Sequence, residues 1–289
     1  MSILVKDIVQ MAETQLERCG ISEAKLNAEL IFRHLLRVDK MGFFKLWGTA
    51  LDDATWDRYL DLITQRTQGM PLQYITGEQE FMGFTFLVNP GVLIPRQDTE
   101  ILVTEVVSMI QASKKRSLSV LDLGCGSGAI GVSIAKLCDN VKVAASDIDK
   151  NAVETAKRNA KALSVEKKMS FAVGNWFEPF KGRFKPETFD IIVSNPPYIK
   201  SHVIPDLQVE VRDHEPLLAL DGGSDGLAYY RKIISKVHIH LKKEGILALE
   251  IGHDQTIDVA KIAEDYGKFN DLKLVKDLAG NDRVLIFYM

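Results

Sequence analysis

The alternation of short apolar segments with amphipathic helices after residue 118 constrains the fold more than any other feature of the sequence. Each apolar segment has strand composition, and each helical segment has one apolar face. Short strands that alternate with helices are typical of a parallel sheet covered on both faces. The expected strands are 119–123, 141–146, 169–173, 189–194 and 246–251, and the expected helices are 130–137, 151–163, 227–241 and 255–266.

The last two apolar segments, 272–275 and 284–288, have no helical pattern between them. Neighbouring strands that are joined without a helix pair in the antiparallel direction. We expect this pair to close one edge of the sheet. The predicted fold class is therefore α/β, with a mostly parallel seven-stranded sheet, helices on both faces and an antiparallel C-terminal edge.

The first seventy residues contain helical periodicity and no strand pattern. One helix is expected from about residue 4, a second after a cap at Ser22, and a third from Asp52 or Asp53. These segments predict a small helical bundle.

Residues 71–95 are rich in aromatic and β-branched residues that Gly77, Gly83 and Gly91 interrupt, which is typical of a β-hairpin. A helical pattern over 98–111 then opens the α/β region. We expect a helical domain at 1–70, a hairpin linker at 71–95 and an α/β domain at 96–289.

Composition argues against several classes of protein. The net charge of −3 provides no basic field for nonspecific nucleic-acid binding. The three cysteines lack the spacing of a zinc site or a disulfide framework, and the six histidines do not converge on a metal site. No apolar run approaches the roughly 18 residues of a membrane span, and the N-terminal segment does not resemble a secretion signal. We expect a cytoplasmic monomer that binds neither a membrane nor nucleic acid directly.

The segment VLDLGCGSGAIG places a glycine-rich turn between the first strand of the sheet and the next helix. Glycine lets a ligand approach the backbone closely, and this end of a parallel sheet is where nucleotide-like ligands bind. The turn also matches GxGxxG, a weak dinucleotide pattern. The acid just before the glycines favours a cationic sulfonium or ammonium ligand over a pyrophosphate. The candidate cofactor residues here are Asp122, Gly124, Cys125, Gly126, Ser127 and Gly128.

Polar residues also follow the next two expected strands. Asp147 is placed to accept hydrogen bonds from both ribose hydroxyls of an adenosine, whereas Asp149 is the better helix cap. Asn175 offers an amide to the adenine edge, and Trp176 offers a ring to its face, although the tryptophan fits a core position equally well. These residues predict an adenosine site but do not distinguish a dinucleotide from S-adenosylmethionine.

The segment Asn195-Pro196-Pro197-Tyr198 is the most informative for chemistry. Two consecutive prolines restrict the backbone and lack N–H groups, so the backbone here offers carbonyl acceptors without the matching donors. The Asn195 side-chain oxygen and the Pro196 carbonyl are placed to accept both hydrogens of a planar NH2 group, while Tyr198 packs against its face. This arrangement directs the nitrogen toward an electrophile such as a sulfonium methyl group.

The motifs LDLGCGSGAIG, SDID, NWF and SNPPYI, in this order, resemble those of class I S-adenosylmethionine-dependent methyltransferases that act on an amide or an exocyclic amine. The segment from Gly77 to Arg96 is similar to that of the protein-glutamine N5-methyltransferases, and PRQDTE resembles their release-factor-directed branch. The similarity covers nearly the whole chain and includes EPLLAL, GSDG, EIG and DLAGNDR; the helical domain is its least specific part.

The resemblance implies an enzyme of translation termination that methylates the glutamine of the Gly-Gly-Gln loop in class 1 peptide chain release factors. It assigns the cofactor to the glycine turn, Asp147, Asn175 and Trp176, and catalysis to residues 195–198, with Asn195 near both ligands. Cys125 then acts through its backbone. For Arg96 a structural ion pair is a stronger expectation than a substrate contact.

Three other readings remain open. An adenine-N6 methyltransferase of nucleic acid uses the same tetrapeptide on a flipped base, but this chain has no strongly basic segment beyond KKR. An NAD-dependent oxidoreductase explains GxGxxG but not residues 195–198. A noncatalytic release-factor-binding module is the third.

Overall fold

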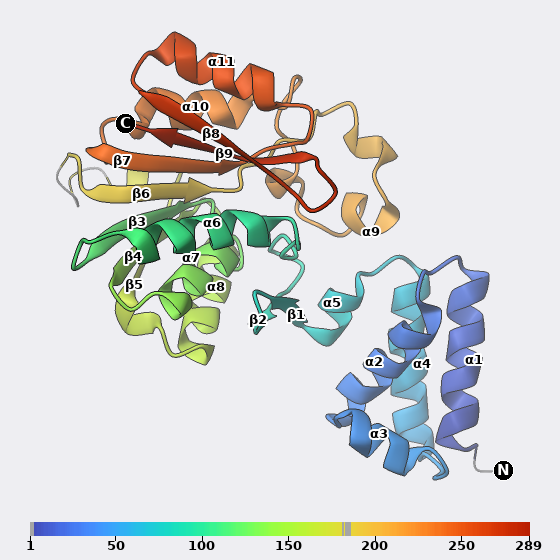
Figure 1. Cartoon of the computed structure of the whole chain (residues 1–289). Helices are drawn as coiled ribbons and strands as arrows, with labels where there is room; N and C mark the ends of the chain where they lie inside the picture. Colours follow the sequence, from blue (N-terminus) through green and yellow to red (C-terminus); the bar gives the residue numbers. More distant parts are fainter. Residues whose placement is uncertain (1–2, 181, 183–185) are drawn as a thin grey trace. The chain divides into compact units, whose positions relative to one another are not determined.

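The computed structural model describes residues 3–180, 182 and 186–289, which fold into two compact units (Figure 1). The first unit comprises Met1–Glu78 together with Gln208–His214, and the second comprises Gln79–Leu207 together with Glu215–Met289. The chain therefore leaves the second unit after Leu207 and returns to it at Glu215.

The first unit is helical and encloses its own apolar core. Phe32, Tyr59 and Ile63 are fully buried there, and the Tyr59 hydroxyl donates a hydrogen bond of 2.9 Å to the carbonyl of Ala28. Packing of these apolar faces stabilises the short helices. Its helices are α1 (Val5–Arg18), α2 (Ala24–Leu36), α3 (Lys40–Leu46), α4 (Asp53–Thr67), α5 (Leu72–Thr76) and α9 (Val209–Arg212).

The helix starts of this unit test two sequence predictions. Helix α4 begins at Asp53, one of the two expected positions, and the Asp52 side chain caps it by accepting the backbone N–H of Thr55. The expected cap at Ser22 is wrong: the residue before α2 is Glu23, which adopts a left-handed conformation with φ of 53°. Helix α3 was not predicted, because seven residues are too few to establish a helical period.

The hairpin prediction holds for only part of its segment. Strands β1 (Glu78–Phe81) and β2 (Phe84–Leu87) form a two-stranded sheet, but 72–76 is the helix α5. The carbonyl of Pro71 accepts the first bonds of that helix, and Gly77 ends it with φ of 74°. Aromatic and β-branched composition was therefore misleading where a proline and a glycine enclose one helical turn.

The second unit is an α/β fold built on a seven-stranded sheet, with the strand order β5-β4-β3-β6-β7-β9-β8 among the described residues (Figure 1). The pairs from β5 to β7 are parallel, and β9 is antiparallel to both neighbours, which confirms the predicted class. The elements are α6 (Thr99–Ala112), β3 (Leu118–Leu123), α7 (Ala129–Leu137), β4 (Val141–Asp147), α8 (Lys150–Ala162), β5 (Met169–Val173), β6 (Phe189–Ser194), α10 (Ala228–Val237), β7 (Leu241–Glu250), α11 (Thr256–Tyr266), β8 (Asp271–Lys276) and β9 (Asp282–Tyr288).

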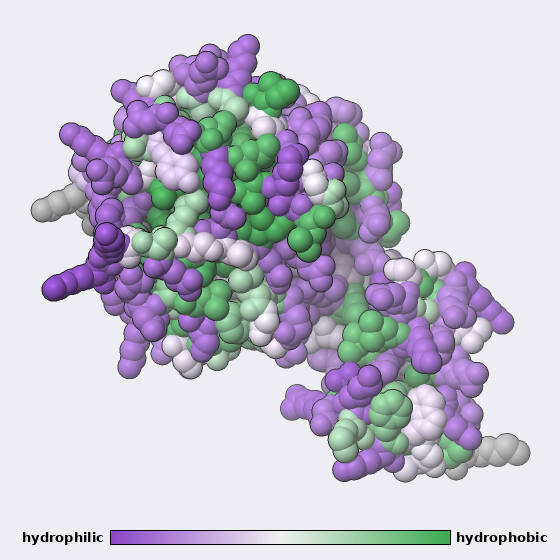
Figure 2. Space-filling view, in the orientation of Figure 1, coloured by the Kyte–Doolittle hydropathy of each residue, from purple (hydrophilic) through white to green (hydrophobic). Residues whose placement is uncertain are grey.

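Alternate residues of the strands face opposite cores. Val120 packs with α6, α7 and α8, whereas Leu121 packs with α10 and α11. This period of two is what a sheet with helices on both faces requires. In the described residues no helix is long and apolar enough to span a bilayer. The face in Figure 2 is mostly hydrophilic, with apolar residues gathered over the β8–β9 edge.

The amino end of β6 carries a buried polar cluster. The Asp190 carboxylate accepts hydrogen bonds from Lys115 and Lys242, both 2.8 Å long, and from the Ser119 backbone. Burial opposes ionisation, but these bonds prevail and lower the pKa of Asp190. The cluster stabilises the end of the sheet opposite the carboxyl ends of the strands.

Candidate active site

A cavity of about 330 Å³ lies at the carboxyl ends of β3, β4 and β6. Its volume is in the range of small-molecule sites. Strands β3 and β6 are direct parallel neighbours, so the residues that follow them meet at one edge of the sheet. The predicted site residues that line it are Gly124, Cys125, Gly126, Ser127, Asp147, Asn175, Trp176, Asn195 and Pro197.

The glycine turn needs glycine for two reasons. Gly124, Gly126 and Gly128 have positive φ of 70°, 54° and 82°, which side chains disfavour. A Cβ atom on Gly128 would also lie 2.9 Å from the Cβ of Ala156. Gly128 is the residue before the first turn of α7 and does not line the cavity, so its contribution is to the conformation of the turn.

The Asp147 carboxylate is fixed by two backbone donors at the end of β4. Its Oδ2 accepts from Gly126 and its Oδ1 from Asp149, each at 2.9 Å. Burial is the largest influence and raises the pKa of Asp147. Asp149 caps α8 by accepting from Asn151, as the sequence predicted. These two bonds fix the orientation of the Asp147 carboxylate, which lines the cavity.

Asp122 lies beneath the turn and does not line the cavity. Its Oδ2 accepts the Gly131 N–H at 2.9 Å, whereas its buried Oδ1 has no hydrogen-bond partner in the described residues. Burial raises the pKa of Asp122 to about 7, and the Asp147 charge adds to this effect. Asp122 supports the start of α7, and a direct cofactor contact stays a prediction.

The segment after β5 and helix α10 each contribute an aromatic ring to the cavity wall. Trp176 lines the cavity with φ of 48°, an uncommon conformation for a bulky residue that concentrates at functional sites. Its ring centroid lies 5.1 Å from that of Tyr229. The exposed Ile148 and Asn175 line the cavity beside it. Apolar surface beside the Asp147 acceptor fits an adenosine, whose base is flat and whose ribose donates hydrogen bonds.

Asn195 follows β6 directly, next to the glycine turn. The Ser194 hydroxyl donates to the Leu123 carbonyl at 2.7 Å and so ties the ends of β6 and β3 together. The Asn195 Nδ2 donates to the Thr99 hydroxyl at 3.1 Å. This bond uses the NH2 group of Asn195 and leaves its carbonyl oxygen as the acceptor available to a ligand.

The other members of the tetrapeptide occupy different surroundings. Pro197 lines the cavity, whereas the buried Pro196 does not. Tyr198 is also absent from the lining; its carbonyl accepts from Gln255 at 3.1 Å and its ring packs in the core beside α10. Burial raises the pKa of the Tyr198 hydroxyl. The expected contact of Tyr198 with a substrate NH2 group stays a prediction.

Cys125 lines the cavity but is almost completely buried. Burial raises the pKa of its thiol well above the usual value, and the charges of Asp122 and Asp147 act in the same direction. A neutral thiol is a poor nucleophile. The expectation that Cys125 acts through its backbone agrees with this environment.

Two important residues of the site escaped the sequence reasoning. Thr99 lines the cavity and accepts from Asn195. Asn159 of α8 is fully buried and joins the glycine turn to β2, because its amide donates to the carbonyls of Ser127 and Leu87. The position of Asn159 on the apolar face of α8 was a signal in the sequence that could have indicated its role. No local pattern indicated that Thr99 binds Asn195.

Arg96 forms an ion pair with Glu215, whose side chain is 1% exposed. The pair joins the segment before α6 to the loop whose Pro216 and Leu218 line the cavity. The expectation of an ion pair is therefore confirmed. Arg96 itself also lines the cavity, so a ligand contact is compatible with this position.

Replacing Arg96 by methionine is expected to lower the free energy of unfolding by about 1–3 kcal/mol, because the buried Glu215 carboxylate loses its cationic partner. Urea denaturation measures this change. The matched control is Arg158→Met, at an exposed arginine of α8, for which a change within about 0.5 kcal/mol is expected. Equal effects of the two substitutions would show that the ion pair contributes nothing.

Two protein families have models that match separate parts of this chain. The family model of the methyltransferase small domain matches residues 95–211, and that of the PrmC N-terminal domain matches residues 7–77. A release factor glutamine methyltransferase from Clostridium acetobutylicum is 38% identical and covers 98% of this chain and 97% of its own length. One from Agrobacterium fabrum is also 38% identical, with coverage of 96% and 94%.

Solved structures agree on the fold. A methyltransferase from Pyrococcus furiosus superimposes with a TM-score of 0.50 at 20% identity, covering 72% of this chain and 89% of its own. A 16S rRNA methyltransferase from T. thermophilus gives 0.51 at 19% identity, covering 73% and 49%. With its sheet order and its glycine turn, this protein is a class I S-adenosylmethionine-dependent methyltransferase. The relatives extend over almost the whole chain, and by that similarity it belongs to the release factor glutamine methyltransferase family.

Proposed function

We propose that this protein methylates the side-chain amide nitrogen, N5, of the glutamine in the Gly-Gly-Gln loop of class 1 peptide chain release factors, with S-adenosylmethionine as methyl donor. The observation that carries the proposal is the position of Asn195. Its NH2 group is held by Thr99, so its carbonyl oxygen is left to accept from a substrate amide beside the glycine turn.

An amide nitrogen is a weak nucleophile because its lone pair is delocalised into the carbonyl group. Hydrogen bonds from both of its N–H groups to fixed acceptors place electron density back on the nitrogen and fix its direction. Asn195 Oδ1 is one such acceptor, and the Pro196 carbonyl is the proposed second. Held orientation of reacting groups accounts for several kcal/mol of rate acceleration, about 7–11 in favourable cases.

The cofactor is held, in this proposal, by the Asp147 carboxylate at the ribose and by the apolar surfaces of Ile148 and Trp176 at the base. The backbone of Gly124 to Gly128 leaves room for its remainder. When bound, S-adenosylmethionine supplies an electrophilic methyl group on its sulfonium. Pro216 and Leu218 add apolar surface to the wall of the same cavity.

The helical unit is the proposed recognition domain for the release factor. A short loop offers much less area than the roughly 800 Å² per partner of a stable interface, so a second contact surface is needed. Met41 and Phe44 of α3 and the neighbouring Trp47 are exposed in this unit. A release-factor substrate would place the reaction in the cytoplasm, where translation terminates.

Methyl transfer is testable with the purified protein, labelled S-adenosylmethionine and a class 1 release factor. We expect mass spectrometry to locate one added methyl group on the glutamine of the Gly-Gly-Gln peptide. The intact factor should be modified at lower concentration than a short peptide, since only the factor reaches a second contact surface. A release factor with that glutamine replaced by alanine is the control.

An adenine-containing oligonucleotide serves as the competing substrate in the same assay. Label in the oligonucleotide with none in the release factor would favour adenine-N6 methylation and overturn the proposal.

A further inference from the structure

A buried polar cluster lies next to Asn195, at the edge of the cavity. Glu250 ends β7, the strand beside β6, and is 1% exposed. Ser194 of β6 pairs with Leu249 of β7, which places Asn195 next to Glu250. Thr99, at the start of α6, and Asn195 both favour the charged form of the Glu250 carboxyl. Glu250 does not line the cavity. It therefore lies next to the proposed substrate-binding amide without forming part of the cavity wall.

The carboxyl of Glu250 is unusual for a group so deeply buried. Its Oε2 has no hydrogen-bond partner in the described residues. Burial is the largest influence and raises its pKa to about 7, against the opposing effects of Thr99, Arg283 and Asn195. Keeping an incompletely satisfied carboxyl in a core is costly. Core packing alone gives no reason for a glutamate at this position.

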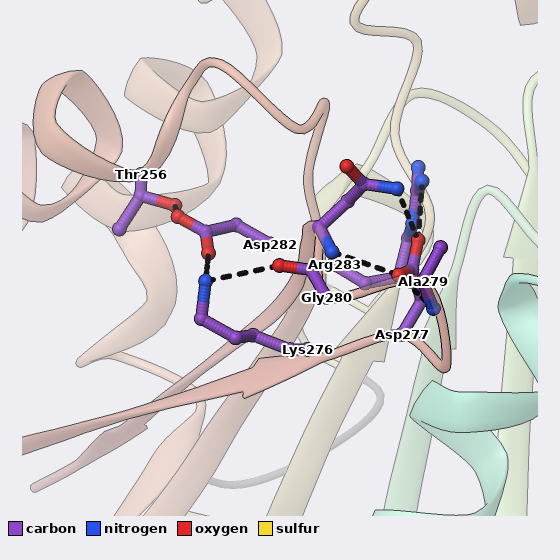
Figure 3. A network of polar contacts seen from close by, with 8 residues as sticks. Thr256, Lys276, Asp277, Ala279, Gly280, Asp282 and Arg283 are labelled. Atoms are coloured by element: carbon purple, nitrogen blue, oxygen red, sulfur yellow. Dashed lines mark hydrogen bonds and ion pairs between the residues drawn. The ribbon is translucent and has the colours of Figure 1, made fainter.

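Arg283 supplies the positive charge beside Glu250, and the C-terminal turn holds Arg283 in place (Figure 3). Asp277 accepts from Ala279, Asn281 and Arg283. Arg283 also pairs with Asp98, directly before Thr99, at 3.1 Å. The segments PRQDTE and DLAGNDR thus meet next to Asn195.

We propose that Glu250 and Thr99 are positioning residues, which hold the NH2 group of Asn195 toward the core so that its carbonyl oxygen faces the substrate amide. The two ends of an asparagine amide have nearly the same shape, so shape alone does not select one orientation. In its ionised form, which Thr99, Arg283 and Asn195 favour, the Glu250 carboxylate only accepts, so in that form the NH2 group of Asn195 is the end that it binds. This inference rests on the proposed function, because it assigns the freed oxygen to the glutamine substrate.

The test compares Glu250→Gln with the wild type. Glutamine has the shape of glutamate but offers both a donor and an acceptor, so it no longer selects one orientation of Asn195. We expect kcat for release-factor methylation to fall about 10- to 100-fold, as small errors of orientation do. KM and the cofactor Kd are expected to stay within about 3-fold, because Glu250 contacts neither ligand.

A second readout does not depend on activity. In the protein without cofactor, the side-chain NH2 protons of Asn195, assigned by their loss in Asn195→Ala, are expected to exchange slowly with water. Exchange should become faster in Glu250→Gln and in Thr99→Val. Thr99→Ser keeps the hydroxyl and should restore both the slow exchange and the activity, which a purely steric role of Thr99 would not.

Asp190→Asn is the matched control, since it neutralises an equally buried carboxylate at the far end of β6. Its kcat should stay within about 2-fold of the wild type. If Glu250→Gln fails to fold, the same measurements of kcat and NH2 exchange on Thr99→Val test the proposal. Normal kcat and unchanged NH2 exchange in the variants would overturn the positioning role. A wild-type protein that leaves the release factor unmethylated would instead contradict the proposed function.

Discussion

Replacing Asn195 by alanine is expected to lower kcat for glutamine methylation by about 100- to 1000-fold, the range observed when one preorganised polar group is removed from an active site. The substitution removes the acceptor that orients the substrate nitrogen, and Thr99 then lacks the group that it binds. Affinity for S-adenosylmethionine should stay within about 3-fold, because the ribose and base are held by other residues. Single-turnover kinetics and calorimetric titration measure the two quantities separately.

Asn140→Ala is the matched control for this substitution. Asn140 lies before β4, at the opposite edge of the sheet, where its amide donates to the Lys115 carbonyl. Its loss should leave kcat unchanged. Undiminished turnover of Asn195→Ala would refute the assigned role of Asn195, whatever the behaviour of Glu250 and Thr99.

Replacing Asp147 by alanine is expected to weaken S-adenosylmethionine binding about 100-fold or more, since two hydrogen bonds to a charged group contribute about 1.5–3 kcal/mol each. The substitution also frees the Gly126 N–H, which the carboxylate fixes in the turn. Equilibrium titration of the cofactor measures the loss. Asp139→Ala, at the exposed start of the same strand, should bind normally.

The pH dependence of binding follows from the same carboxyl group. Burial raises the pKa of Asp147, so protonation begins at a higher pH than for an exposed aspartate. Cofactor affinity is therefore expected to decrease as the pH falls toward that raised pKa, and Asp147→Asn should remove this part of the pH dependence. Identical pH profiles of the two proteins would contradict an ionised acceptor at the ribose.

Local sequence patterns were sufficient to predict those features that depend only on residues close together in the chain. The apolar strand β3, the glycines with positive φ and the Asp149 cap were all predictable, because each depends on neighbours within a few residues. The errors have local causes as well. One turn of helix at α5 was read as strand, and α3 was too short to show a period.

The placement of Asn195 beside the glycine turn was predictable in part, because carboxyl ends of parallel strands share one edge. Its orientation was not. Thr99, Glu250 and Arg283 are separated from Asn195 by 55 to 96 residues in the chain, and no local pattern indicates that they meet. Arg96 was expected to form an ion pair, but Glu215 could not be identified as its partner before the fold was known.

The sequence by itself determined the class of fold, and it predicted the cofactor turn and the acceptor for the substrate nitrogen, since chain geometry and residue chemistry act over short stretches. Only the tertiary structure showed that the NH2 group of Asn195 donates to Thr99, and which distant residues lie next to this pair. The physical reason is that hydrogen bonds and ion pairs act over a few ångströms in space. The order and crossing of the strands determine which distant residues come that close.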